Sequence, residues 1–322
     1  MRVLFWGTPE FAVPTLRALG EEGYPVVAVV TQPDRPAGRG RKVRPSPVAE
    51  VADAEGIPVL KPERPRGEAF EAELRALAPD ISVVVAYGHI LGAGILDLPR
   101  AGSWNVHASL LPALRGAAPI HWAIARGYDT TGVTIMRMSE GMDAGPILHQ
   151  VEETIDPDET STELALRLSE VGARALIEGL AFLKYGGGEP VEQDHERATY
   201  APKVSRGVAR IDWTRGAREV ADHVRAMDEV PGAWTEWAGA PLKLFRPSLE
   251  AQDESDPESI PNPEDAPVGT VVAVDRSDAG GLAVAAGDGP VWFREVQPAG
   301  KRRMPVGPWL RGRGAAPDDR FE

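Results

Sequence analysis

Strand-length apolar runs alternate with helical patterns through the first half of the chain, and this alternation constrains the fold most strongly. The runs lie at 2–7, 26–31, 57–60, 80–88 and 102–109. Helical patterns separate them at about 9–19, from residue 47, and at about 67–77. Strands joined by helices are typical of a parallel sheet with helices on both faces. The expected fold class is therefore α/β, with a doubly wound, mostly parallel sheet.

The pattern changes after residue 128. Apolar runs at 132–138 and 146–155 lie too close together for a helical crossover, so they predict an antiparallel edge to the same sheet. A long amphipathic helix follows at 160–184, where Thr160 and Glu163 have the spacing of a capping box.

The last third of the chain predicts a second, smaller domain. Short strand runs separated by Gly/Pro turns lie at 233–237, 241–246, 268–274, 282–286 and 290–297. Such runs are typical of a small, OB-like β-barrel. We therefore expect an N-terminal domain at 1–188, a linker at 189–207, a barrel domain at 208–313 and a tail at 314–322.

Composition excludes several kinds of chemistry. The 322 residues include no cysteine, which rules out disulfides, thiolate zinc sites and a cysteine nucleophile. The six histidines show no HxxxH or HExxH spacing, so we expect no metal. No apolar run approaches the roughly 20 residues of a membrane helix, and the N-terminus reads as a strand rather than a signal peptide. We expect a cytoplasmic protein with no membrane contact.

Charge is unevenly distributed along the chain. The net charge of −13 argues against a general nucleic-acid binder, but residues 35–44 carry five bases and no acid. Such a segment is a candidate contact for a polyanion. The segment 250–265 carries seven acids and no base, which predicts a solvated loop of unassigned function.

The ends of the predicted parallel strands are where an α/β sheet binds its ligands. No GxGxxG or P-loop motif follows the first strand, so the usual cradle for a dinucleotide or nucleoside triphosphate is missing. Asn105 and His107 lie two apart near the end of the run at 102–109, so both side chains face one side. They could offer an oxyanion donor and a titratable imidazole, or they could be satisfied by the backbone.

Two nearby segments add to this pair. Ser109, Leu110, Leu111 and Pro112 form an apolar loop that could wall a flat heteroaromatic ligand or pack as an ordinary loop. Asp143 lies between two glycines and could bend towards the histidine or bind its own backbone. A Ser–His–Asp hydrolase built on Ser109 is disfavoured because no GxSxG motif is present.

Several motifs in order make the chain resemble the methionyl-tRNA formyltransferase family over nearly its whole length. They are FWGTPEFAVPTL (5–16), the basic segment TQPDRPAGRGRKVRPSPV (31–48), VVVAYGHIL (83–91), NVHASLLPALRGAAPI (105–120), GVTIMRMSEGMDAGPIL (132–148), ARIDW (209–213), LKLFR (242–246), AAGDGPV (285–291) and VQPAGKRRM (296–304). The sequence departs from the family at Ala108, where glycine is usual, and at Ala113-Leu114, which replace a basic–aromatic pair.

The resemblance implies a function and a set of site residues. It implies formyl transfer from 10-formyltetrahydrofolate to methionyl-initiator tRNA, with no metal. Asn105, His107 and Asp143 stand at the catalytic positions, and Ser109, Leu110, Leu111 and Pro112 at the folate site. The basic segment, with Arg39, Arg41, Lys42 and Arg44, is the expected tRNA contact, and the barrel is expected to bind tRNA as well. Lys301, Arg302 and Arg303 are further candidates, and a monomer is expected.

Three alternatives share parts of this pattern. A glycinamide ribonucleotide formyltransferase would have the same Asn-His-Asp residues, but its chain would end near residue 200. A formyltransferase acting on a sugar-nucleotide amine can carry a similar second domain. A noncatalytic RNA-binding module is the alternative from another class, and it would not need Asn105.

Overall fold

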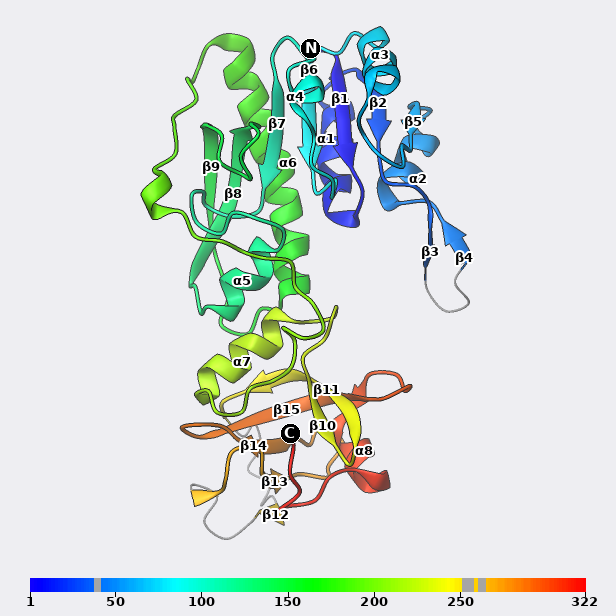
Figure 1. The fold of residues 1–322 in the computed structure, drawn as a ribbon. Coiled ribbons are helices and arrows are strands. Elements are labelled where there is room, and N and C mark those ends of the chain that lie inside the picture. Colours follow the sequence, from blue (N-terminus) through cyan, green and yellow to red (C-terminus); the bar gives the residue numbers. More distant parts are fainter. Residues whose placement is uncertain (38–41, 251–257, 260–264) are drawn as a thin grey trace. The chain divides into compact units, whose positions relative to one another are not determined.

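The computed structural model describes residues 1–37, 42–250, 258–259 and 265–322, which form two units (Figure 1). The N-terminal unit comprises Met1–Pro119, Thr130–Thr154 and Ala165–Pro202. The C-terminal unit comprises Ile120–Asp129, Ile155–Leu164 and Lys203–Glu322. The chain therefore crosses from one unit to the other more often than a single predicted linker implies. No helix within the described ranges is both long and apolar enough to cross a membrane.

The N-terminal unit is built on a seven-stranded sheet of order β5-β2-β1-β6-β7-β8-β9. Its strands are β1 (Val3–Gly7), β2 (Val26–Val30), β5 (Val59–Leu60), β6 (Ile81–Val85), β7 (Ser103–His107), β8 (Thr130–Arg137) and β9 (Ile147–Thr154). The first five are parallel, and β8 and β9 form the antiparallel edge that the sequence predicts. The chain moves outward from β1 to β5 and returns at β6, so the switch point lies between β1 and β6.

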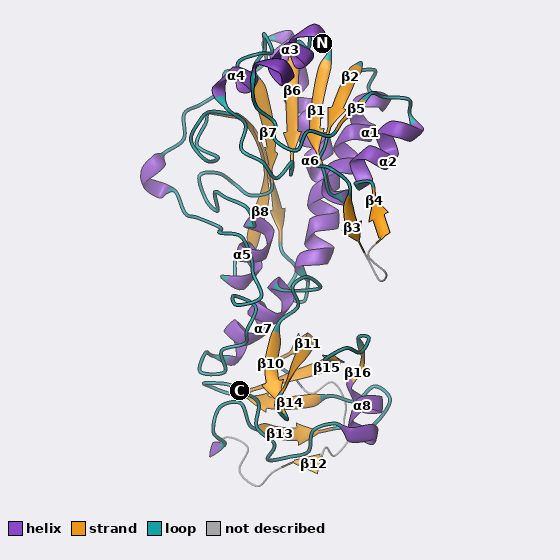
Figure 2. Ribbon diagram, turned by 45° about the vertical axis from the view of Figure 1, so that its right-hand side comes forward, coloured by secondary structure: helices purple, strands orange, loops and turns teal. Residues whose placement is uncertain are grey.

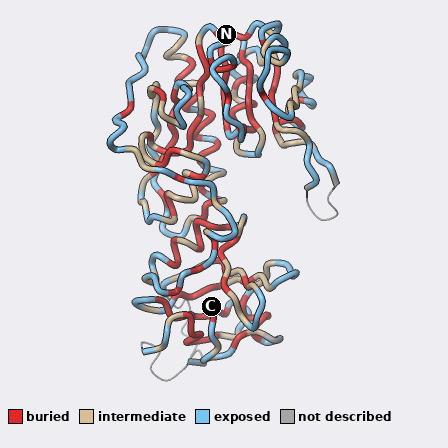
Figure 3. Tube along the Cα trace, in the orientation of Figure 1, coloured by how far each residue is buried: buried red, intermediate tan, exposed pale blue. Residues whose placement is uncertain are grey.

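Helices cover both faces of this sheet (Figure 2). They are α1 (Val13–Glu21), α2 (Pro47–Ala54), α3 (Glu68–Ala76), α4 (Ala93–Leu96) and α6 (Ser161–Tyr185). The helix α5 (Pro119–Ala125), which precedes β8 in the chain, belongs to the C-terminal unit apart from Pro119. On one face, Leu74 of α3 and Ile95 of α4 pack with Trp6 and Val84 of the sheet. On the other face, α6 approaches the sheet closely at Gly172. The strands β1 and β6 are buried throughout, so the core follows the sheet (Figure 3).

Two predicted helix starts have different outcomes. Before α6, the Thr160 amide donates to Glu163 Oε2 at 2.9 Å and the Glu163 amide donates to Thr160 Oγ1 at 3.3 Å, which confirms the capping box. The Thr160 backbone N–H holds the pKa of Glu163 below its usual value. Thr8, which precedes the helical pattern at 9–19, does not cap the first helix. Its hydroxyl donates to the Tyr87 carbonyl at 3.2 Å, and a short 3-10 turn precedes α1.

The described residues of the basic segment form the two paired strands of a hairpin. The strands β3 (Arg35–Ala37) and β4 (Lys42–Arg44) pair antiparallel, with Arg35 opposite Arg44. Like charges directly opposite each other destabilise a strand pair in the absence of a counter-charge. The hairpin therefore presents two exposed guanidinium groups from one face.

The C-terminal unit contains a second, mainly antiparallel sheet of order β10-β11-β15-β14-β13-β12, with β16 pairing to β15. Its elements are β10 (Trp234–Trp237), β11 (Ala240–Ser248), β12 (Glu258–Ser259), β13 (Val271–Val274), β14 (Leu282–Ala285), β15 (Pro290–Pro298), β16 (Met304–Pro305), α7 (Ala217–Ala226) and α8 (Val306–Arg313). The short strands agree with the predicted barrel. Within the acidic segment 250–265, only Glu250, β12 and Asp265 belong to the described residues.

Residues 314–322, expected to be a tail, bridge two strands of the barrel instead. The Val271 amide donates to the Asp319 carbonyl at 2.8 Å on one side. On the other side, Glu236 and Glu322 exchange two backbone hydrogen bonds of 3.0 Å. Phe321 is only 2% exposed, and its ring lies 6.2 Å from that of Trp213. The buried ring of Phe321 thus helps to anchor residues 314–322 to the barrel, although most of this segment is polar or small in composition.

We predict that Phe321→Ala lowers the free energy of unfolding by about 3–5 kcal/mol, because it leaves a cavity where the final segment joins the barrel. Denaturant unfolding followed by tryptophan fluorescence measures the loss. Leu166→Ala, at a position that is 61% exposed, is the control and should change little. A cost below about 1 kcal/mol for Phe321→Ala would contradict this role.

Candidate active site

The strand β7 carries the predicted pair of side chains into the sheet between β6 and β8. Asn105 lies opposite Val84 in the register, so its side chain emerges on the face covered by α3 and α4. His107 shares that face because it lies two residues further on. Val106 points the other way, where a Cβ on Gly172 of α6 would lie 2.9 Å from Val106 Cγ1. The predicted alternation along this strand is confirmed.

His107 is buried, with 5% of its surface exposed, and both ring nitrogens face oxygen atoms. Its Nε2 lies 3.1 Å from the Leu114 carbonyl oxygen. A carbonyl only accepts, so Nε2 carries a proton. Its Nδ1 lies 3.7 Å from Asp143 Oδ2, which is too long for a direct hydrogen bond but close enough for a charge interaction. Nδ1 is therefore the nitrogen available for proton exchange.

Asp143 reaches this position from the turn between β8 and β9. Its φ of +47° lies in the left-handed region, which is uncommon for residues other than glycine but tolerated by aspartate. Its Oδ2 accepts the Gly116 backbone N–H at 2.8 Å. This donor lies on a separate loop, which argues against a turn aspartate that binds its own backbone. The structure brings Asp143 and His107 together.

A glycine next to this turn makes its closure possible. A Cβ on Gly145 would lie 1.9 Å from the Arg137 carbonyl oxygen, closer than any side chain allows. On the other side of the turn, a Cβ on Gly141 would lie 3.1 Å from the Ala144 Cβ and 3.9 Å from Ser139 Oγ. Gly145 is therefore the glycine that the turn requires.

Asn105 is half-buried at the same strand end. Within the described part of the chain, its side-chain amide has no hydrogen-bond partner. An amide that is partly exposed and uncommitted can donate to an oxygen atom of a ligand. Its position two residues before His107 would direct both groups to one reacting atom.

The loop after β7 offers a ligand only part of the predicted apolar wall. Ser109 and Leu111 are buried, and the Ser109 hydroxyl donates to the Ala113 carbonyl at 2.6 Å. The Leu111 amide donates to Thr134 Oγ1 at 3.1 Å. Leu110 and Pro112 are half-buried. Ser109 and Leu111 therefore hold the loop in place, and Leu110 and Pro112 have the accessible surface.

Residues 191–201, predicted as part of a linker, form an ordered strap on this loop. The Leu114 amide donates to Thr199 Oγ1 at 2.9 Å, and the Ala201 amide donates to the Arg115 carbonyl at 2.7 Å. Arg115 is 4% exposed, and its guanidinium donates to Gln193 Oε1. The strap is polar and has no strand or helix period, so the sequence carries no signal for it.

The predicted tRNA contacts are only partly described. Arg39 and Arg41 lie outside the described residues, and Lys42 lies in β4. Arg44 is exposed at the end of β4, opposite Arg35. The structure thus adds Arg35 to the basic hairpin as a second exposed cation on the same face.

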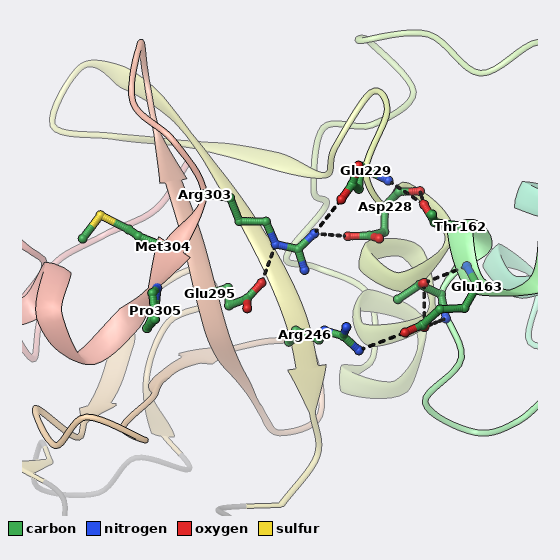
Figure 4. Close-up of a pocket in the computed structure, with 10 residues that line it drawn as sticks. Thr162, Glu163, Asp228, Glu229, Arg246, Glu295, Arg303, Met304 and Pro305 are labelled. Carbon is green, nitrogen blue, oxygen red and sulfur yellow. Dashed lines mark hydrogen bonds and ion pairs between the residues drawn. The ribbon is translucent and has the colours of Figure 1, made fainter. Parts of the chain in front are cut away.

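A cavity of about 400 Å³ in the C-terminal unit is formed without the predicted catalytic and folate residues (Figure 4). Arg303 lies at its centre, 2.7 Å from Asp228 Oδ1 and also paired with Glu295. Arg246 lies 3.3 Å from Glu163 Oε1. The charge of Arg303 is thus already paired with carboxylates. Arg303 is therefore a weaker candidate for a phosphate contact than Lys301 and Arg302.

Comparisons with known proteins give the same family for both units. Residues 1–180 match the family model "Formyl transferase", and residues 203–314 match "Formyl transferase, C-terminal domain". A methionyl-tRNA formyltransferase of Symbiobacterium thermophilum is 48% identical over 100% of this chain and 95% of its own. The one from Acidobacterium capsulatum is 46% identical over 100% and 99%. WlaRD, a sugar 3N-formyl transferase solved with dTDP and 5-N-formyl-THF, has a similar fold, with a TM-score of 0.64, 16% identity, and coverage of 94% of this chain and 99% of its own.

We predict that Gly145→Ala lowers the free energy of unfolding by about 1–3 kcal/mol, because the new Cβ forces the turn away from Arg137. Gly141→Ala, in the same turn, is the matched control and should cost less than Gly145→Ala, because its contact of 3.1 Å needs a smaller shift. Denaturant unfolding of both variants measures the difference. Equal losses would show that the contact with the Arg137 carbonyl does not govern the turn.

Proposed function

The chain belongs to the methionyl-tRNA formyltransferase family, and on that premise we propose that it formylates methionyl-initiator tRNA with 10-formyltetrahydrofolate. The products are N-formylmethionyl-tRNA and tetrahydrofolate. The observation that carries the proposal is the half-buried Asn105 amide beside the His107–Asp143 pair, in a chain that is 48% identical to a relative of that name over its full length.

The reaction makes one C–N bond and breaks another. The free α-amine of the methionyl group attacks the formyl carbon, and negative charge develops on the formyl oxygen. The bond from the formyl carbon to N10 of the folate then breaks. The amine loses one proton and N10 gains one, so the reaction needs an oxyanion donor and a group that exchanges protons.

The three site residues match these needs. The uncommitted amide of Asn105 can donate to the developing oxyanion. His107 can exchange a proton at Nδ1 while its Nε2 stays bonded to the Leu114 carbonyl. The carboxylate of Asp143, 3.7 Å from Nδ1, stabilises the imidazolium that forms when the proton arrives. None of these steps requires a metal.

The folate is proposed to bind against the loop at 109–112. Leu110 and Pro112 present half-buried apolar surface, which suits the flat face of a pterin. Ser109 and Leu111 hold this loop in place through hydrogen bonds to the Ala113 carbonyl and the Thr134 hydroxyl. A charge at Leu111 would disturb the fold itself, so Leu110 is the better position for testing folate contact.

The tRNA is proposed to contact the basic hairpin through Arg39, Arg41, Lys42 and Arg44, together with Arg35. The pairing of Arg35 opposite Arg44 supports this, because a phosphate between two like charges removes their repulsion. Of the further candidates in the barrel unit, Lys301 and Arg302 remain. Arg303 is excluded because it is paired with Asp228 and Glu295.

A sugar-nucleotide amine is the competing acceptor. Its support is the fold similarity to WlaRD at 16% identity, which extends to the fold alone. Incubating the protein and 10-formyltetrahydrofolate with methionyl-initiator tRNA, with a dTDP-amino sugar, or with buffer separates the two acceptors directly. Formylation of the sugar without formylation of the tRNA would overturn the proposal.

We predict that Asn105→Ala lowers kcat for tRNA formylation by about 10²–10³, because it removes an oxyanion donor. His107→Ala should cost at least as much, because it also removes the proton-exchanging group. Initial rates with saturating folate and tRNA provide the measurement, with the fold checked by circular dichroism.

His149→Ala is the matched control for these kinetics. This histidine lies on β9 of the same unit, where its Nε2 pairs with Glu178 at 2.7 Å. Its loss should leave kcat close to that of the wild type. Near-normal turnover by His107→Ala would rule out the proposed chemistry.

We also predict that Arg35→Ala combined with Arg44→Ala raises KM for tRNA and leaves KM for 10-formyltetrahydrofolate unchanged. Each lost phosphate contact should flatten the log–log dependence on salt by about 0.7–0.9. Initial rates against tRNA concentration at several salt concentrations give the slope.

Arg17→Ala combined with Arg75→Ala is the control for charge alone. Both side chains are exposed on helices of the same unit, so the net charge changes equally. If both double variants changed the slope equally, the effect would reflect total charge, and the hairpin would lose its assigned role.

A further inference from the structure

The side-chain amide of Gln193 links the two loops that form the candidate site. It is 6% exposed and lies in the strap at 191–201. Its Oε1 accepts from Arg115 Nη2 at 2.6 Å and from Nε at 3.1 Å. Its Nε2 donates to the Asp143 carbonyl at 2.9 Å and to the Gly145 carbonyl at 2.6 Å. One amide therefore joins the loop after β7 to the turn that carries Asp143.

The chemistry of the partners fixes the orientation of this amide. A guanidinium only donates, so the atom that faces Arg115 is the oxygen. Backbone carbonyls only accept, so the atom that faces Asp143 and Gly145 is the nitrogen. A flipped amide would lose all four contacts. Asparagine, the other side chain with an amide, is one methylene shorter.

We propose that Gln193 is a positioning residue that holds the Asp143 carboxylate against His107. Asp143 has a φ of +47°, a conformation that is uncommon outside glycine, and two contacts from other segments hold it there. Gln193 restrains its carbonyl, and the Gly116 amide restrains its carboxylate at 2.8 Å. Gly116 follows Arg115 directly, so both restraints act through the same loop. The kinetic consequences rest on the proposed function.

The test compares two substitutions that break this link differently. Gln193→Glu keeps an oxygen for Arg115 but turns a second oxygen towards the carbonyls of Asp143 and Gly145. Gln193→Met keeps the length of the side chain and removes both functions. Gln297→Glu is the control, because Gln297, a half-buried residue of β15 in the other unit, also donates to one backbone carbonyl, that of Lys301 at 3.0 Å.

The kinetic expectation is a loss in kcat with little change in KM. Displacement of a group in the site by about 1 Å can cost up to about a hundredfold, so we expect Gln193→Glu and Gln193→Met to lower kcat by about ten- to a hundredfold. KM for folate and for tRNA should stay within about twofold, and Gln297→Glu should keep wild-type kcat. In an Asp143→Asn background, Gln193→Glu should cost less than about twofold more, because its effect passes through Asp143.

A second readout needs no activity. In NMR spectra of the labelled protein, the Gly116 amide reports its bond to the Asp143 carboxylate. In Gln193→Glu this amide proton should move upfield and exchange with solvent about ten times faster, and in Gln297→Glu it should not change. If tRNA is not formylated even by the wild type, the proposed function fails and this readout still decides the role of Gln193.

Three results would overturn the inference. One is an unchanged Gly116 amide in a folded Gln193→Glu or Gln193→Met protein. Another is wild-type kcat for Gln193→Glu, which would mean that only the contact with Arg115 matters. The third is a full additional loss in the Asp143→Asn background, which would show that Gln193 acts independently of Asp143.

Discussion

The hydrogen bond from the Gly116 amide to the Asp143 carboxylate is the interaction on which the arrangement of the site depends. It joins the loop after β7 to the turn after β8, and it sets the carboxylate 3.7 Å from His107 Nδ1. Asp143 adopts a left-handed backbone conformation, and its carboxylate and its carbonyl are both bonded to other segments. The carboxylate therefore depends on contacts from segments far away in the sequence, and the proposed chemistry depends on those contacts in turn.

The sheet holds His107 and Asn105 in fixed positions on a strand. His107 is the last residue of an internal strand, and its backbone lies opposite Thr134 of β8. Its Nε2 is bonded to the Leu114 carbonyl, which leaves Nδ1 towards Asp143. Asn105, on the same face of the strand, keeps an amide for a ligand. A rigid strand thus holds the two groups proposed to meet the substrate, and Asp143 is held by loops that brace one another.

Much of the fold can be predicted from the sequence, because buried strands appear there as apolar runs or as alternating apolar and polar residues. Apolar runs mark β1 and β6, and alternation along 103–107 is enough to place Asn105 and His107 on one face. The pairing of Asp143 with His107 stays open at the level of sequence, because it depends on a turn whose direction no period encodes. The strap around Gln193 resembles a linker in composition, since its stability comes from hydrogen bonds between polar groups. Phe321 escapes prediction for a related reason: one aromatic residue in a polar segment gives no pattern.

Single-turnover formyl transfer by Asp143→Asn tests the central claim most directly. Asparagine keeps an oxygen to accept the Gly116 amide but removes the negative charge that stabilises the His107 imidazolium. Mixing the variant and 10-formyltetrahydrofolate with methionyl-initiator tRNA and following N-formylmethionyl-tRNA isolates the chemical step. The account predicts a rate constant lower by about 10² or more, with Kd for both substrates unchanged. A wild-type rate constant in this variant would contradict it.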